Sequence, residues 1–148
     1  MVDVGAEATS VGEESNWPDF YPKDILVPPA DSSPASGDFY RLVLNDPPTR
    51  SCFLSTHEEQ PNRHKGCRDI YAKQNVYGLS VFELKEQAND TREKFRNALG
   101  KRLLSKGHFI NEDGQIKKTF SPGHHTVWLR VDANPQIRFN VISEEKQK

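Results

Sequence analysis

Long apolar runs and cysteines are scarce in this chain, and each scarcity excludes a class of protein. No stretch approaches the ~20 apolar residues that a membrane-spanning helix needs, and the first residues show no basic region followed by an apolar run. The 2 cysteines, Cys52 and Cys67, do not make a disulfide framework. We therefore expect a soluble protein of the reducing cytoplasm, with neither a secretory signal nor a membrane span.

Signatures of nucleotide, nucleic-acid and metal binding are also missing. The sequence holds no Gly-x-Gly-x-x-Gly and no P-loop, which are the common phosphate cradles. Its pI of about 6.5 lies below the value of about 9 that nucleic-acid-binding domains usually exceed, so nucleic acid is an unexpected partner. His124 and His125 are adjacent and diverge in a regular strand, and no second ligand pair exists, so no metal site is predicted.

Acidic residues gather near the N-terminus. Residues 1–37 hold 7 acids and 1 base, and the net charge of −1 for the whole chain leaves residues 38–148 about five charges positive. An acidic, Pro/Ser-rich leader buries too little apolar surface to offset its ordering entropy. We predict a largely non-globular leader over residues 1–37, one α+β domain over residues 38–143 and a solvated tail over residues 144–148.

One part of the leader, Asn16 to Pro29, is too apolar for an idle linker. Its prolines forbid a regular helix. Between them stand five large apolar side chains: Trp17, Phe20, Tyr21, Ile25 and Leu26. Two interpretations stay open. The segment lies on the domain as a strap that covers an apolar patch, or it is a linear motif that binds a partner protein through these five side chains.

Alternating apolar residues predict two strands in the first half of the domain. Phe39 to Asn45 is the first strand and Val76 to Phe82 is the second, with a long basic loop over residues 60–75 before the second strand. Gly78 removes a side chain from one face of the second strand. A glycine at such a position predicts close approach of backbone or of a ligand.

The second half of the domain combines one helix with further strands. The helix begins near Glu83 and is expected to end near Lys106, with Gly100 as the other possible end. Strand runs follow in this order: the two halves of a hairpin within His108 to Phe120, residues 124–131, and Ile137 to Ile142. The order of elements predicts an α+β fold with a mainly antiparallel, possibly split, sheet packed against one long helix.

The strand after the Pro-Gly turn divides its residues between two faces. One face carries an imidazole and an apolar row and is expected to be core: His125, Val127, Leu129 and Val131. The other face carries an imidazole, a hydroxyl, an indole and a guanidinium: His124, Thr126, Trp128 and Arg130. This second row is either a ligand platform or the open side of an ordinary amphipathic strand.

Arg41 is a charge in the middle of the first strand, where it shares a face with Phe39 and Val43. A charge among apolar neighbours must be paired or must hold an anion. A phosphate or carboxylate ligand would suit its guanidinium. The alternative is an ion pair with a carboxylate of the chain itself.

The stretches FYRLVLNDPPT…FLS, YGLSVF and SPGHHTVW together resemble a family of small uncharacterised bacterial proteins. Members share patterns of the type FYR-apolar-V, PPT, F-L-S, G-apolar-S-V-aromatic and G-H-x-T-apolar-W. The resemblance spans about residues 38–142. It implies a shared fold and carries no established activity.

A further set of residues is similar to ADP-ribosyltransferase-like domains, which are small split sheets that bind NAD. The resemblance implies that Arg41 would hold the pyrophosphate and that Ser80 would lie beneath the nicotinamide ribose. Tyr77 or Trp128 would stack on the nicotinamide. Many such enzymes use a Glu-x-Glu pair that this chain lacks, so His124 or the glutamate after the second strand would stand in for it.

Two functions therefore stay open, and whether the protein is an enzyme is left undecided. The first is a protein-interaction or accessory module recruited through the aromatic leader segment, which predicts a filled sheet face and scattered polar residues. The second is a nucleotide or NAD-type anion-binding domain, an enzyme or a relic of one. Its candidate ligand residues are expected to converge on one cleft: Arg41, Tyr77, Ser80, His124, Thr126, Trp128 and Arg130. No catalytic residue is assigned, and NAD is the one cofactor suggested.

Overall fold

The computed structural model describes residues 16–120 and 122–142. It contains one seven-stranded sheet with the order β1-β5-β6-β3-β2-β4-β7, in which every pair of neighbouring strands is antiparallel. The strands are β1 (Ser33–Pro34), β2 (Gly37–Val43), β3 (Leu79–Phe82), β4 (Leu103–Phe109), β5 (Gly114–Lys118), β6 (His124–Leu129) and β7 (Phe139–Val141).

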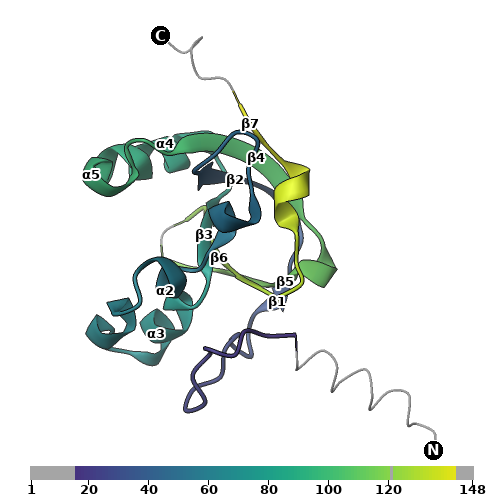
Figure 1. The fold of residues 1–148 in the computed structure, drawn as a ribbon. Helices are drawn as coiled ribbons and strands as arrows, with labels where there is room; N and C mark the ends of the chain where they lie inside the picture. The colour runs from purple at the N-terminus through teal and green to yellow at the C-terminus, as the bar shows by residue number, and fades with distance from the viewer. Residues whose placement is uncertain (1–15, 121, 143–148) are drawn as a thin grey trace, which may run out of the picture.

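Short helices accompany the sheet, so the α+β prediction is confirmed. The α-helices are α2 (Thr56–Glu59), α3 (Ile70–Val76), α4 (Lys85–Lys94) and α5 (Arg96–Leu99). The 3₁₀ helices are η1 (Arg50–Phe53), η2 (Arg63–Gly66), η3 (Asn111–Asp113) and η4 (Pro135–Arg138). Figure 1 shows α4 and α5 together on one side of the sheet, with α2 and α3 lying apart from them beside β3. No helix of the described residues is long and apolar enough to cross a membrane.

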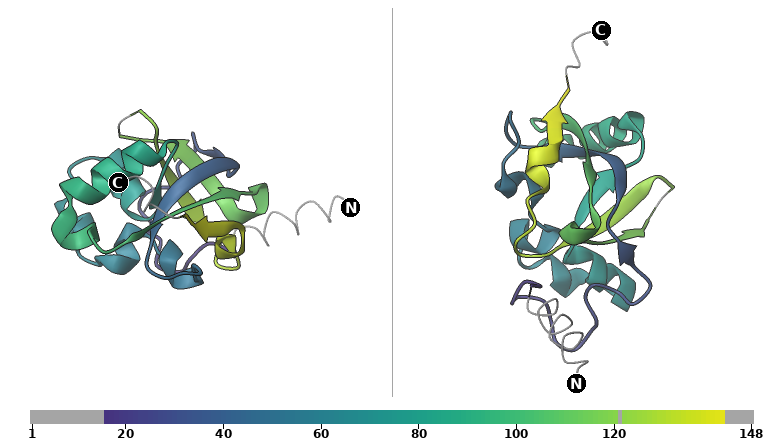
Figure 2. Two further views of the ribbon diagram at one scale, coloured as in Figure 1. Left: turned by 90° about the horizontal axis from the view of Figure 1, so that it is seen from above. Right: turned by 90° about the vertical axis from the view of Figure 1, so that its right-hand side faces the viewer.

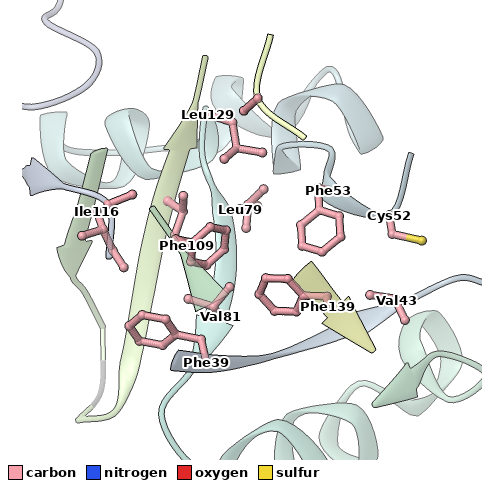
Figure 3. Close-up of a cluster of buried hydrophobic side chains, with 13 residues drawn as sticks. Phe39, Val43, Cys52, Phe53, Leu79, Val81, Phe109, Ile116, Leu129 and Phe139 are labelled. Carbon is pink, nitrogen blue, oxygen red and sulfur yellow. The ribbon is translucent and has the colours of Figure 1, made fainter. Parts of the chain in front are cut away.

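The sheet curves around one large apolar core, as Figures 1 and 2 show. Strands β2 to β7 all direct side chains into it, and η1 adds Cys52 and Phe53. Phe139 of β7 lies 5.0 Å from Phe53 and 5.3 Å from Phe109, measured between ring centroids. Figure 3 shows these rings pointing toward one another in the space that the sheet encloses. Residues distant in sequence therefore share one core, which fixes the curvature of the sheet.

The open side of the curve is spanned by the segment that leads from β6 to β7. Arg138, at the end of η4, donates two hydrogen bonds to the carboxylate of buried Asp113, at 2.9 and 2.8 Å. It donates a third to the carbonyl oxygen of His108, at 2.8 Å. A bidentate arginine–carboxylate contact of this kind is geometrically specific, and here it ties β7 to the connection between β4 and β5.

The outer face of the sheet carries two smaller apolar clusters. Helix α4 covers the first through Ala88, which packs against Leu42, Phe82 and Leu104. The second lies at the other end of the sheet and is covered by the N-terminal segment that we call the strap, residues 16–29. Both clusters lie on the face opposite to the main core, since side chains alternate along each strand.

The strap packs on the domain through the aromatic side chains that make it unusual. Trp17, Tyr21 and Ile25 contact a buried cluster that includes Tyr77 and Trp128. The backbone of Val131 donates to the carbonyl of Asn16 at 2.7 Å, and Gln74 donates to the carbonyl of Leu26 at 2.9 Å. Residues 16–29 therefore lie on the domain as a strap, which was one of the two interpretations of this segment, and β1 then joins residues 33–34 to the sheet. The predictions for residues 1–15 and for the tail over residues 144–148 lie outside the described residues.

Two predicted elements between β2 and β4 are wrong. The basic stretch of residues 60–75 is not a loop, because it contains η2 and α3. The predicted helix is divided into α4 and α5, and it ends at Leu99, beside the alternative end Gly100, not near Lys106; the residues from Leu103 onward form β4. Strand β4 pairs along its whole length with β2, and the side chains of Leu104 and Ser105 are buried there.

The predicted hairpin over His108 to Phe120 is also wrong. Strands β4 and β5 flank the expected turn, but β4 pairs with β2 and β7, whereas β5 pairs with β1 and β6. The hairpin that does form joins β5 to β6, with Gly123 at φ +86° in the turn. Positive φ at that position fits the expected Pro-Gly turn.

Candidate functional site

The two adjacent histidines point to opposite faces of β6, as predicted. The His124 ring packs 5.3 Å from the Phe82 ring on the outer face, and the His125 ring packs 4.9 Å from the Phe39 ring on the core side. They therefore cannot share one ion. Within residues 16–120 and 122–142, no group of three or more His, Cys, Asp or Glu side chains could hold a metal.

His124 is a neutral, hydrogen-bonded histidine inside the protein. Its Nδ1 lies 2.9 Å from the Thr119 hydroxyl, which lies 2.8 Å from the Thr126 hydroxyl. The pKa of His124 is lowered to about 4, chiefly by burial and also by the neighbouring His125, against a hydrogen bond with Thr119 that raises it. The hydroxyl–imidazole pair of Thr119 and His124 resembles a nucleophile with its base, but both side chains are buried and so do not meet a substrate.

The outer-face row of β6, which was a possible ligand platform, is covered by other parts of the protein. Thr126 is 2% exposed and Trp128 is 0% exposed, with the indole of Trp128 donating to the carbonyl of Gln74 at 3.0 Å. The strap covers Trp128, and Gly78 allows the close approach, since a Cβ on Gly78 would lie 2.4 Å from Cγ2 of Thr126. The expected close approach at Gly78 is that of the backbone and side chains of β6, not that of a ligand.

Arg41 lies on the face opposite to this row. Tyr40 of β2 pairs with Phe82 of β3, which pairs with His124 of β6, so these three side chains share the outer face. Arg41 follows Tyr40 in β2 and therefore points to the core side, as Phe39 does. Ser80 pairs with Thr126 on the outer face. The predicted convergence of Arg41 with the outer-face residues is therefore wrong.

Among the described residues, no carboxylate forms an ion pair with Arg41, although a carboxylate partner was one of the two predictions. Its guanidinium donates to the carbonyl oxygens of Cys52, at 3.2 and 3.0 Å, of Ser80, at 2.8 Å, and of Leu54, at 3.5 Å. Burial lowers the pKa of Arg41 to about 10, a shift that Glu59 opposes, so the group stays charged at neutral pH. Backbone dipoles thus solvate this cation, which joins β2, β3 and the segment after η1.

A cleft opens at the end of the curved sheet where β3 begins and β6 ends. We call it the mouth cleft, and its volume is about 320 Å³. Its floor is apolar and comes from the main core and its margin: Phe53, Leu54, Leu79, Val127, Leu129 and Val131. The strap forms one wall with Pro18, Phe20 and Tyr21. Polar side chains reach the cleft from three segments: Arg50, Ser55 with Glu58, and Tyr77. Mouths of curved or closed sheets are common sites for small ligands.

Charges converge on the Tyr21 hydroxyl at this cleft. Burial raises the pKa of Tyr21 well above its usual range, Glu58 raises it further, and Arg50 opposes the shift. Burial also raises the pKa of Tyr77, with Asp24 and Cys67 acting in the same direction. Both phenols are therefore neutral hydrogen-bonding groups at physiological pH.

A second exposed feature lies on the outer side of α3. Three apolar side chains lie exposed there: Tyr71 at 62%, Leu26 of the strap at 59% and Ile70 at 47%. Lys117 lies beside one of them, with its ammonium 5.1 Å over the Tyr71 ring, and three exposed basic residues precede α3 in the sequence: Arg63, Lys65 and Arg68. We call these seven residues the α3 surface.

The candidate residues predicted from the sequence are dispersed over these features. Of the predicted ligand residues, Tyr77 lines the mouth cleft, and Arg130 lies outside it with its guanidinium 4.4 Å over the Trp17 ring. Of the predicted partner-binding residues, Phe20 and Tyr21 line the cleft and Leu26 belongs to the α3 surface. Trp17 and Ile25 are packed against the domain.

Sequence reasoning found Tyr21 and Tyr77 but missed the other polar residues of the mouth cleft, Arg50, Ser55 and Glu58. Ser55 and Glu58 form a capping box for α2, with the Glu58 backbone donating to the Ser55 hydroxyl at 3.1 Å, and the spacing Ser-x-x-Glu is a signal that could have located it. Arg50 follows the Asp-Pro-Pro-Thr turn and had no such signal.

The fold and these surfaces define a small α+β protein whose curved antiparallel sheet has a cleft at one end and a basic, partly apolar surface beside it. Comparisons with protein-family models, curated proteins and solved structures found no match. The two resemblances stated from the motifs stay predictions.

Proposed function

We propose that this protein is a non-catalytic interaction module that binds an acidic segment of a partner protein through the α3 surface. The observation that carries the proposal is the exposure of three apolar side chains, Leu26, Ile70 and Tyr71, in a segment rich in exposed basic residues, with Lys117 over the Tyr71 ring. Aromatic residues and arginine are enriched in protein interfaces, where a few of them supply most of the binding energy.

The charge of this surface selects the kind of partner. Residues 60–75 hold four basic residues and one acid, Asp69, whose carboxylate caps α3 by accepting from the backbone of Ala72 at 2.8 Å. Among the described residues, Arg63, Lys65 and Arg68 form no ion pair with a carboxylate. Three solvated cations beside an apolar centre attract a segment that combines carboxylates with an aromatic or aliphatic side chain.

The strap holds the apolar centre in place. Gln74 of α3 donates to the carbonyl of Leu26, and Lys73 lies 3.6 Å from the carboxylate of Asp24. The ring of Tyr71 is held under Lys117, which also lies 3.1 Å from Asp31. A surface that is ordered before binding loses less conformational entropy when a partner docks.

The second function predicted from the sequence, binding of a nucleotide or NAD-type anion, has less support. That hypothesis required Arg41 and the β6 row to meet in one cleft. The guanidinium of Arg41 is instead bound to backbone carbonyls, and Trp128 is covered by the strap. The filled face and the dispersed polar residues are what the interaction module predicts.

Selection of short peptides from a random display library on the immobilised full chain tests the proposal. We expect the enriched peptides to combine Asp or Glu with an aromatic or aliphatic residue. Their NMR chemical-shift perturbations should map to the α3 surface, and their affinity should fall as salt rises. Tyr71→Ala should weaken binding about tenfold or more, as expected for an aromatic residue at the centre of an interface.

Phe95→Ala is the matched control, because Phe95 is also an exposed aromatic side chain, between α4 and α5, far from Tyr71 in sequence. It should leave peptide affinity unchanged. Enrichment of basic or uncharged peptides, or equal losses in the two variants, would contradict the proposal. Tighter binding of single-stranded RNA than of any selected peptide would contradict it as well and would assign the basic residues to nucleic acid.

A further inference from the structure

Two side chains of opposite charge line the mouth cleft without pairing with each other. Arg50 comes from η1 and Glu58 from α2, and no ion pair joins them. Both line the cleft together with Tyr21 of the strap. A cation and an anion that stand apart in one small cleft fit a ligand that carries both charges.

The guanidinium of Arg50 is positioned by backbone groups and keeps donors to spare. Its Nε donates to the carbonyl of Ala133 at 3.0 Å, and its Nη1 donates to the carbonyl of Phe53 at 3.1 Å. Its Nη2 has no partner among the described residues. Arginine has five N–H donors, so the two anchoring bonds fix its plane and leave donors for a carboxylate.

The carboxylate of Glu58 is positioned in a similar way. Its Oε1 accepts hydrogen bonds from the backbone and the hydroxyl of Ser55, at 2.9 and 3.0 Å. Its Oε2 accepts none from the described residues, so it remains available to an ammonium group. The hydroxyls of Tyr21 and Tyr77 add neutral hydrogen-bonding groups to the same cleft.

The remainder of the cleft is apolar and small. Leu79, Val127 and Leu129 form its inner floor, and Phe20 of the strap forms a wall. Ligand pockets span about 300–1,000 Å³. The volume of about 320 Å³ therefore admits a small molecule with one apolar group and excludes a dinucleotide.

We propose that the mouth cleft binds a free apolar or aromatic α-amino acid as its zwitterion. Arg50 binds the α-carboxylate, Glu58 binds the α-ammonium, and the apolar floor receives the side chain. The two charged groups of an α-amino acid are separated by one carbon atom, so they engage two protein charges that line one small cleft without forming an ion pair. This site is separate from the α3 surface and does not rest on it.

A series of three related probes tests the proposal on the full chain. L-Phenylalanine carries both charges, L-phenylalaninamide lacks the carboxylate, and N-acetyl-L-phenylalanine lacks the ammonium. NMR titration with each probe should show that removing either charge weakens binding about tenfold or more, the loss expected for a charge-assisted hydrogen bond. Perturbed resonances should include those of residues that line the cleft.

Two variants assign each charge to its partner. Arg50→Gln should bind L-phenylalanine and its amide alike, because the protein no longer distinguishes them. Glu58→Gln should bind L-phenylalanine and its N-acetyl derivative alike. Arg96→Gln and Glu86→Gln are matched controls, because both residues are exposed on α5 and α4 and do not line the cleft; each should retain both discriminations.

A second pair of variants keeps the test decisive where Arg50→Gln fails to fold, since Arg50 also anchors backbone carbonyls. Val131 is exposed and lines the cleft, so Val131→Trp should fill it and abolish binding of L-phenylalanine. Ile137→Trp, at an exposed position outside the cleft, should not. Equal binding of the three probes, absence of any binding by wild type at millimolar probe, or binding that survives Val131→Trp would overturn the proposal.

Discussion

Acid should destabilise this protein through His124, and the effect can be measured apart from that of other groups. The pKa of His124 is about 4 in the folded protein and 6.5 in the absence of burial. Between these two values the unfolded chain binds a proton that the folded protein does not, so the free energy of unfolding rises with pH. The stabilisation is fully present above pH 6.5 and is lost as the pH falls toward about 4.

The size of the effect follows from the difference between the two pKa values. Each unit corresponds to about 1.4 kcal/mol, so full protonation removes about 3 kcal/mol, or about 2 kcal/mol where water screens part of the charge. The structural reason is that a protonated ring would stand beside Phe82 and Phe120, with hydroxyl groups as its hydrogen-bonding neighbours. This is a large share of the roughly 5–15 kcal/mol by which native domains are stable.

The assay is urea denaturation followed by tryptophan fluorescence at pH values between about 7 and about 4.5. His124→Asn keeps a polar atom near the position of Nδ1 but cannot be protonated. It should be less stable than wild type at neutral pH, because ring contacts are lost, and the difference should shrink by about 2 kcal/mol in acid. Burial also lowers the pKa of His125, against Glu83, so the variant should keep a shallower slope rather than none.

His108→Asn is the matched control, because His108 is an exposed histidine on β4. At neutral pH it should change the free energy of unfolding less than His124→Asn does, because an exposed ring loses fewer contacts. A stability difference between wild type and His124→Asn that stays constant from neutral to acid pH would refute the reasoning, since it would mean that His124 titrates alike in the folded and unfolded states.

Two further changes test the packing around β2, β3 and β6. Arg41→Met should lower the free energy of unfolding by about 3 kcal/mol in urea denaturation, because the carbonyls of Cys52 and Ser80 lose their donor while buried. Arg41→Lys should recover little of this stability, since lysine lacks the forked guanidinium. A Met variant as stable as wild type would contradict the prediction. Gly78→Ala should cost about 2 kcal/mol because its Cβ would lie 2.8 Å from the carbonyl oxygen of Val127, and Gly66→Ala, which meets nothing within 4 Å, is its control. Equal thermal stability of the two alanine variants would show that the close approach at Gly78 relaxes freely.

Local alternation predicted the strands that belong to the main core. Phe39 and Val43 face the core and Leu42 faces α4, as the period of two requires. The same rule separated His124 from His125. These predictions succeed because each strand buries one face against a large apolar cluster. The alternation of apolar and polar residues over a few consecutive positions then shows which side chains are buried.

Predictions that needed pairing over long sequence distances failed. Leu99 and Leu103 continue a helical spacing on paper, but β2 offers β4 a full set of backbone partners, and the strand forms instead. Helix α3 was missed because only Gln74 and Val76 are buried in it, so it has almost no apolar stripe. In both cases the deciding contacts lie dozens of residues away, outside any local window.

The candidate site shows the same division between local and distant information. The alternation placed Arg41 correctly between Phe39 and Val43, and it also revealed that such a charge needs partners. It could not show that those partners are the carbonyls of Cys52, Leu54 and Ser80, because any residue type supplies a carbonyl. Backbone acceptors cannot be recognised in a sequence. The sequence therefore suggested an anion site at Arg41, although backbone carbonyls already accept the hydrogen bonds of its guanidinium.

The two surfaces that the sequence offered for function are two halves of one buried contact. For the polar row of β6 and for the aromatic leader the sequence left open both an outside partner and a structural role, and Trp128 and Trp17 belong to the same packed cluster. Since an apolar surface left open in water is unfavourable, two such surfaces in one chain are expected to cover each other first. Two features of the strap then remain available to a partner or ligand. One is the exposed side chain of Leu26 beside α3, and the other is the mouth cleft beneath Tyr21.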